Sequence, residues 1–216
     1  MPFKDLLLAL KAYRDTTPTD VVERAVSCAA LLEARLCALA FELEVRTPSS
    51  PLANALLDLP GIAEEEEAKS RASALALLDV FGRAASARGV ASERVLERCM
   101  EGQIPGVVTE HARLRDLTII PVERASGFQQ HVAECVIFGS GRPVLILPAR
   151  SEAEASALDA IGVAWDFSRP AARALASAMP LLQRAKTVRV VTVRGEKPIQ
   201  TGRSASDLAR HLACHG

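Results

Sequence analysis

Aromatic residues are scarce in this 216-residue chain: they make up 4% of it, with one tryptophan, Trp165, and one tyrosine, Tyr13. The core must therefore be built from Leu, Val, Ile and Ala, a composition that suits helices packed on a parallel sheet. Net charge is also absent, because 26 Lys and Arg balance 26 Asp and Glu, while 49% of the residues are hydrophobic. This balance argues against a disordered chain and against a polybasic nucleic-acid-binding arm.

Paired cysteines and long apolar segments are missing as well. The five cysteines are widely spaced and form no Cys-x-x-Cys pair, so we expect small apolar core residues in a reducing compartment rather than disulfides or zinc ligands. No apolar stretch approaches the roughly 18 residues of a membrane span, and the first apolar run is too short for a signal peptide. We therefore expect a soluble, cytoplasmic protein that binds neither membranes nor nucleic acid.

Apolar runs alternate with amphipathic segments over residues 3–148, which predicts five strands joined by four helices. The strands are expected at residues 6–10, 35–45, 92–99, 117–122 and 143–148, and the helices at about 21–32, 65–88, 106–115 and 128–138. Because parallel neighbours require a crossover, this order predicts an α/β fold, an open five-stranded parallel sheet with helices on both faces. The acidic run at residues 64–67 is interpreted as the solvated start of the second helix, where carboxylates meet the positive end of the helix dipole.

The same elements begin again after a Ser-, Glu- and Ala-rich linker at residues 149–157. Strands are expected at 161–165 and 187–193, and helices from Arg169 to about 184 and over 205–215, at nearly the spacing of the first copy. We therefore predict a complete domain at residues 1–149, followed at residues 158–216 by the strand-helix-strand-helix front of a second domain. Two strands alone leave unpaired edges, so we expect them to join a neighbouring sheet or another subunit, and we predict a homodimer.

Two segments resemble a known family. WDFSRPAARAL, residues 165–175, lies at a strand–helix junction, and HVAECVIFGSGRPVLILP, residues 131–148, closes the first domain. Taken in order over the whole chain, these segments resemble the universal stress protein family in its tandem form. The resemblance implies a Rossmann-like fold of the adenine nucleotide alpha-hydrolase type, with an incomplete second repeat.

Some members of that family bind ATP, and others bind no nucleotide. Binding members have an Asp after the first strand, a residue at the end of the second strand that meets the adenine, and a Gly-x2-Gly-x9-Gly-Ser/Thr loop after the fourth strand. In the first domain Lys11-Ala12 stands at the Asp position, Gln130-His131 at the final Gly-Ser, and Gly127 alone remains of the glycines. The resemblance therefore implies no nucleotide cofactor in the first domain, because glycines are what let backbone N–H groups approach a phosphate.

The second copy keeps more of the pattern. Asp166 matches the family Asp, Ser168 the Ser two residues later, and Val193 the adenine-meeting position, so the resemblance makes these three the candidate ATP-binding residues. The residues by themselves favour another interpretation, in which Ser168 is a helix cap and Asp166 a solvated carboxylate at a strand end. We favour the structural interpretation because the remaining strands and the phosphate loop are absent from this copy.

The leading hypothesis is a universal stress protein-like stress-response or interaction module, a binding protein rather than an enzyme. Two alternatives stay open: an ATP-binding, slowly hydrolysing member whose site lies in the second repeat, and a flavodoxin-like α/β domain that binds a small ligand at the topological switch point. We predict no catalytic set, since nucleophile-elbow and P-loop motifs do not occur. We also predict no metal site: His211 and His215 share a helix face, but an exposed helix end explains them.

Overall fold

The computed structural model describes residues 2–47, 58–123, 126–149, 158–193 and 202–215. The contacts divide the chain into two compact units, a first unit of Phe3–Glu154 and a second unit of Ala155–Gly216 with Met1–Pro2. Among the described helices, none combines the length and the apolar character that crossing a membrane requires. The linker predicted between the two domains falls, from residue 150 to residue 157, outside the described residues.

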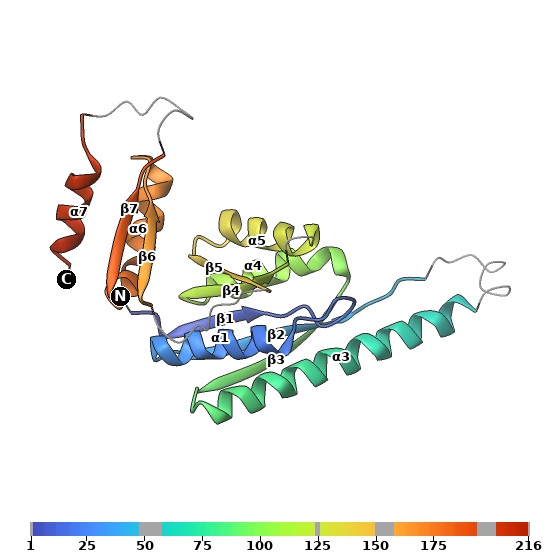
Figure 1. The fold of residues 1–216 in the computed structure, drawn as a ribbon. Coiled ribbons are helices and arrows are strands. Elements are labelled where there is room, and N and C mark those ends of the chain that lie inside the picture. The colour runs from blue at the N-terminus through green and yellow to red at the C-terminus, as the bar shows by residue number, and fades with distance from the viewer. Residues whose placement is uncertain (1, 48–57, 124–125, 150–157, 194–201, 216) are drawn as a thin grey trace. The chain divides into compact units, whose positions relative to one another are not determined.

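The first unit is an open parallel sheet of five strands in the order β3-β2-β1-β4-β5 (Figure 1). The strands are β1 (Asp5–Ala9), β2 (Arg35–Leu43), β3 (Ser92–Cys99), β4 (Leu117–Val122) and β5 (Val144–Pro148). Helix α1 (Thr19–Leu32) packs against α3 (Leu59–Ala87), and α4 (Ile104–Arg113), which follows a 3-10 turn at Glu101–Gln103, packs against α5 (Gly127–Gly139). These two helix pairs cover the two faces of the sheet, which confirms the predicted α/β fold.

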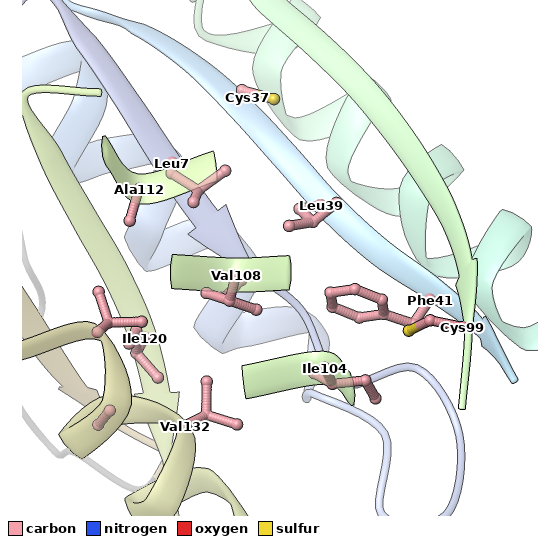
Figure 2. Packing of buried hydrophobic residues seen from close by; sticks show 13 residues of the cluster. Leu7, Cys37, Leu39, Phe41, Cys99, Ile104, Val108, Ala112, Ile120 and Val132 are labelled. Atoms are coloured by element: carbon pink, nitrogen blue, oxygen red, sulfur yellow. The ribbon is translucent and has the colours of Figure 1, made fainter. Parts of the chain in front are cut away.

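The central strands are buried on both faces, as their unbroken apolar runs predict. Leu6, Leu7 and Leu8 of β1 are fully buried although they are consecutive and their side chains point to alternate faces. Figure 2 shows one of the two layers of the core, in which Leu7 and Leu39 from the sheet meet Val108 of α4.

Helix α3 begins six residues before the start predicted from the sequence, and the prediction that the acidic run forms its first turn was wrong. Asp58 is the N-cap and its side chain accepts a hydrogen bond from Gly61 N at 3.3 Å, while Pro60 occupies the first turn. The acidic run lies in the following turn, where Glu65 pairs with Lys69 at 2.7 Å. Ion pairs along the helix, rather than the helix dipole, therefore stabilise the carboxylates of the acidic run.

The cysteines separate into two groups. Cys37 and Cys99 are buried in the core, as predicted, and burial raises the pKa of both thiols. Burial also raises the pKa of Cys28 to about 11. These three thiols stay protonated at neutral pH and behave as small apolar side chains. The prediction was wrong for Cys214, which is exposed, and holds only partly for Cys28 and Cys135, which are half-buried.

The second unit contains β6 (Ala160–Ala164), α6 (Arg169–Leu182), β7 (Thr187–Val191) and α7 (Ala205–Ala213), in the predicted order. Strands β6 and β7 are parallel, and in the described residues they pair only with each other. Pairing of this small sheet with a neighbouring sheet or with another subunit stays a prediction, as does the status of this unit as a partial copy. One face of the small sheet packs with α6 and α7 through buried Leu175, Leu182 and Leu208.

Candidate functional site

The strand order reverses between β1 and β4, and the crevice outside the carboxyl ends of these strands is where open α/β sheets bind ligands. A cavity lies at this point in the first unit. It is lined by the ends of β1, β2 and β4 and by the starts of α4 and α5, with Ala9, Phe41, Ile104, Val108, Ile120 and Val132 as its apolar walls. The cavity volume is about 50 Å³, far below the roughly 300–1,000 Å³ of pockets that hold small-molecule ligands.

Lys11 lines this cavity at the position where the resemblance requires an Asp. Its ammonium lies 3.3 Å from Asp15 Oδ2, an ion pair in which the Lys11 side chain is the buried partner. Backbone bonds close the same loop, because Thr17 N donates to Lys11 O at 2.8 Å and Lys11 N donates to Thr17 Oγ1 at 3.1 Å. Lys11 therefore already has an ion-pair partner within its own loop.

Tyr13 ties this β1–α1 loop to helix α3. Its hydroxyl donates a short hydrogen bond to Glu66 Oε2, and Arg14 lies within ion-pair distance of the same carboxylate at 3.6 Å. The hydrogen bond to Glu66 raises the pKa of Tyr13 and lowers the pKa of Glu66. The bond joins residues 53 positions apart, and it fixes Tyr13 in the cavity wall.

Side chains of the chain itself also close the β4–α5 loop. Gln129, which is buried, accepts a hydrogen bond from Glu123 N at 2.9 Å, and Ser126 Oγ accepts one from Gln129 N at 3.3 Å. In a nucleotide site of this fold such N–H groups would face the phosphates. Gln129 was not among the predicted site residues, although Ser126-x-x-Gln129 is a capping pattern that could have revealed it.

The candidate residues of the second unit lie where β6 and β7 end. Asp166 Oδ1 accepts a hydrogen bond from Ser168 N at 2.9 Å, and Ser168 Oγ accepts one from Ala171 N at 3.2 Å. Ser168 is thus the N-cap of α6, as the structural interpretation predicts. Val193 follows β7 and its side chain is 63% exposed. The geometry gives Asp166 and Ser168 a turn-forming role, and ATP binding by these three residues stays a prediction.

In the part of the chain that the structure describes, no three His, Cys, Asp or Glu side chains gather in a way that could hold a metal ion. His211 and His215 do meet, with ring centroids 5.0 Å apart. His131 and Cys135, which were not predicted as a pair, lie one helical turn apart on α5, with Cys135 Sγ 3.8 Å from His131 Nε2.

No protein family model matches the chain, and no curated protein matches it. Solved structures do match. A universal stress protein from Archaeoglobus fulgidus shares 18% identity at a TM-score of 0.67, over 96% of this chain and 71% of that chain. A protein from the universal stress protein family of Burkholderia pseudomallei shares 22% identity at a TM-score of 0.48, over 68% of this chain and 96% of that chain.

A universal stress protein family protein from Arabidopsis thaliana, solved with AMP bound, shares 14% identity at a TM-score of 0.47, over 69% of this chain and 94% of that chain. We base the structural comparison on the Archaeoglobus fulgidus protein, because this match extends over nearly the whole chain and has the highest TM-score of the three. The sheet order, the helices on both faces and this match together show that the chain has the Rossmann-like α/β fold of the universal stress proteins.

Proposed function

We propose that the chain is a cytoplasmic stress-response or interaction module of the universal stress protein type, whose first unit does not bind ATP. The observation that supports this function is the closed state of the switch-point cavity. About 50 Å³ of space, apolar walls and a lysine already paired with Asp15 leave neither room nor charge for a nucleotide. Because this cavity is small, we propose that the chain acts through its surface.

The loop chemistry supports the same proposal. Phosphate binding requires several unpaired N–H donors, but Glu123 N and Gln129 N already donate to Gln129 and Ser126 side chains. Pro121, which lines the cavity, has no N–H. A nucleotide would have to displace these bonds and separate Tyr13 from Glu66, and the new contacts would need to offset that loss.

Titration calorimetry tests the nucleotide part of the proposal. We expect no saturable heat when Mg-ATP or AMP is titrated into the full chain to about 1 mM, whereas AMP binding by the Arabidopsis thaliana relative provides the positive control. A saturable site with micromolar affinity would contradict the proposal. If such a site were lost in Asp166→Asn and kept in Lys11→Ala, the alternative with an ATP site in the second unit would replace it.

Exposed apolar side chains on α5 and β5 support the interaction role. Phe138 of α5 is 86% exposed, Ile137 beside it is 47% exposed, and Ile146 of the neighbouring edge strand β5 is 41% exposed. Edge strands with free N–H and C=O groups pair readily with a second copy, and clustered apolar side chains mark protein interfaces. The homodimer predicted from the sequence is therefore proposed to form across β5 and α5 of the first unit.

Light scattering tests the dimer. We expect the wild-type chain to have the mass of a dimer at about 50 µM and the double variant Phe138→Glu/Ile146→Lys to have the mass of a monomer, a loss of affinity of at least tenfold. The matched control is Leu75→Glu, which places a charge at a 44% exposed leucine of α3. If both variants remain dimers, the interface lies elsewhere. If the wild-type chain is a monomer, the proposed dimer is wrong.

A further inference from the structure

His131 and Cys135 are two metal-ligating side chains that lie together on α5. Cys135 Sγ is 3.8 Å from His131 Nε2 and 4.0 Å from His131 Nδ1. Zinc binds a thiolate at about 2.3 Å and an imidazole nitrogen at about 2.0–2.1 Å in a tetrahedral arrangement, which places two such ligand atoms roughly 3.6 Å apart. The pair therefore already has nearly the separation at which both atoms bind one zinc ion.

Both side chains are available to a metal ion. Within the described residues, the only hydrogen-bond partner that either side chain has is the other one. His131 is exposed and Cys135 is half-buried, so an ion from solvent can reach them. A spacing of four residues puts both on one face of the helix, the spacing at which two histidines of a helix bind zinc in metalloproteases.

The other cysteines and histidines are less suited to this role. Burial raises the pKa of three of the other thiols, whereas zinc binds the thiolate. The thiol of Cys214 donates a hydrogen bond to Arg210 O at 3.4 Å. The rings of His211 and His215 meet edge to face at an interplanar angle of 76°, so one ring points toward the face of the other rather than toward a shared ion.

Two ligands do not complete a structural zinc site, which takes four. In the part of the chain that the structure describes, no third His, Cys, Asp or Glu joins the pair. Phe138, three residues after Cys135, is 86% exposed, while Val132 and Val136 are buried on the inner side of α5. The pair therefore lies on the outer surface of α5, which packs beside the edge strand β5 (Figure 1) and belongs to the proposed dimer interface. A two-fold interface presents the same patch of both copies, and hence two His131–Cys135 pairs.

We propose that His131 and Cys135 of two copies bind one zinc ion at the dimer interface. This inference rests on the proposed function, because the second copy supplies half of the ligands. Each Cys135 thiol releases its proton to solvent as its Zn–S bond forms, and each imidazole binds as the neutral base. Two thiolates balance the two positive charges of the ion, so the completed site is neutral and needs no further counter-charge.

Zinc titration of the full chain tests this proposal. The chain is kept reduced and treated with EDTA, and light scattering then follows its mass as zinc is added. We expect one zinc ion per two chains and a dimer dissociation constant at least tenfold lower with zinc than with EDTA, because an ion that binds only the dimer stabilises it. Cobalt, used in place of zinc, should give the sulfur-to-cobalt charge-transfer absorption of a thiolate ligand.

Matched variants locate the site. Cys135→Ser and His131→Gln are each expected to abolish the effect of zinc on the mass, and Cys135→Ser also removes the charge-transfer absorption. Cys214→Ser and His211→Gln make the same changes on α7 and are expected to behave as wild type. The proposal is overturned if no zinc binds, if each chain binds one ion without a change in mass, or if the α7 variants lose the ion as well.

The same measurements separate the zinc site from the dimer on which it rests. If the chain is a dimer in EDTA and zinc does not strengthen it, the zinc site alone is wrong. If the chain is a monomer both in EDTA and in zinc, the dimer and the zinc site are both wrong. If the chain is a monomer in EDTA and a dimer in zinc, the zinc site is supported and the apolar contact of Phe138 and Ile146 does not by itself hold two copies together.

Discussion

Replacing Phe81 with alanine is expected to lower the free energy of unfolding of the first unit by about 3–5 kcal/mol. Phe81 is the largest of the fully buried side chains and lies in α3, which packs on β2, β3 and α1. The chain has few aromatic residues, and its core consists mostly of aliphatic side chains. Truncation therefore leaves a cavity that no neighbouring ring can fill, and the lost burial adds to the cost of that cavity.

Urea unfolding followed by circular dichroism measures this loss. The matched control is Leu75→Ala in the same helix, where a 44% exposed leucine is removed and a change below about 1 kcal/mol is expected. Trp165 fluorescence, which reports on the second unit, should show the same midpoint in both variants. A loss of less than about 1 kcal/mol in Phe81→Ala would show that α3 repacks around the missing ring.

The parallel sheet could be predicted from the sequence because its central strands carry a strong local signal. Runs such as Leu6–Leu8 and Ile119–Ile120 are buried on both faces, and short apolar runs bounded by turn signals are typical of strands in a parallel sheet. The cap residue Ser168 was equally visible, since capping depends on residues within one turn. Local sequence patterns were therefore enough to predict these strands and helices and their order.

The start of α3 was not predictable in the same way. Pro60-Gly61 suggests a break, yet proline in a first helical turn lacks only a hydrogen bond that the helix start does not use, and Asp58 supplies the cap. The six residues from Leu59 to Glu64 therefore extend the helix, although their composition is that of a loop. The first residue of a helix depends on which neighbouring residue can cap it, and here that residue is Asp58.

Only part of the chemistry of the switch-point cavity could be predicted from the sequence. The lack of an aspartate and of the glycines was visible in the sequence, and the structure places Lys11 and Pro121 at the cavity. The contacts that close the loops were not visible, because Tyr13 and Glu66 are 53 positions apart and the Gln129 side chain reaches back to Glu123 N from another element. Long-range side-chain contacts follow from the assembled fold, which a local pattern does not describe.

Replacing Arg115 with alanine is expected to lower the free energy of unfolding of the first unit by about 2–3 kcal/mol. The Arg115 side chain is 15% exposed, and its guanidinium lies 2.9 Å from Asp5 Oδ2 and 3.5 Å from Glu93 Oε2. Arg35 pairs with the same two carboxylates, so four charges form one network at the amino ends of β1, β2 and β3. Without Arg115, the partly buried carboxylate of Asp5 and the exposed carboxylate of Glu93 share a single cation.

The variant Arg94→Ala is the control that separates the effect of burial from the effect of the ion pair itself. Arg94 lies 2.7 Å from Asp79, a distance similar to that of the Arg115 pair, but both side chains are more than half exposed, so a loss of at most about 1 kcal/mol is expected. A double-mutant cycle of Arg115→Ala with Asp5→Ala should give a coupling energy of about 1–2 kcal/mol. Equal losses in Arg115→Ala and Arg94→Ala, or a coupling energy near zero, would show that the network orders the strand ends without stabilising them. The stability would then come from the apolar runs alone, and β1 would tolerate loss of its charged first residue, Asp5.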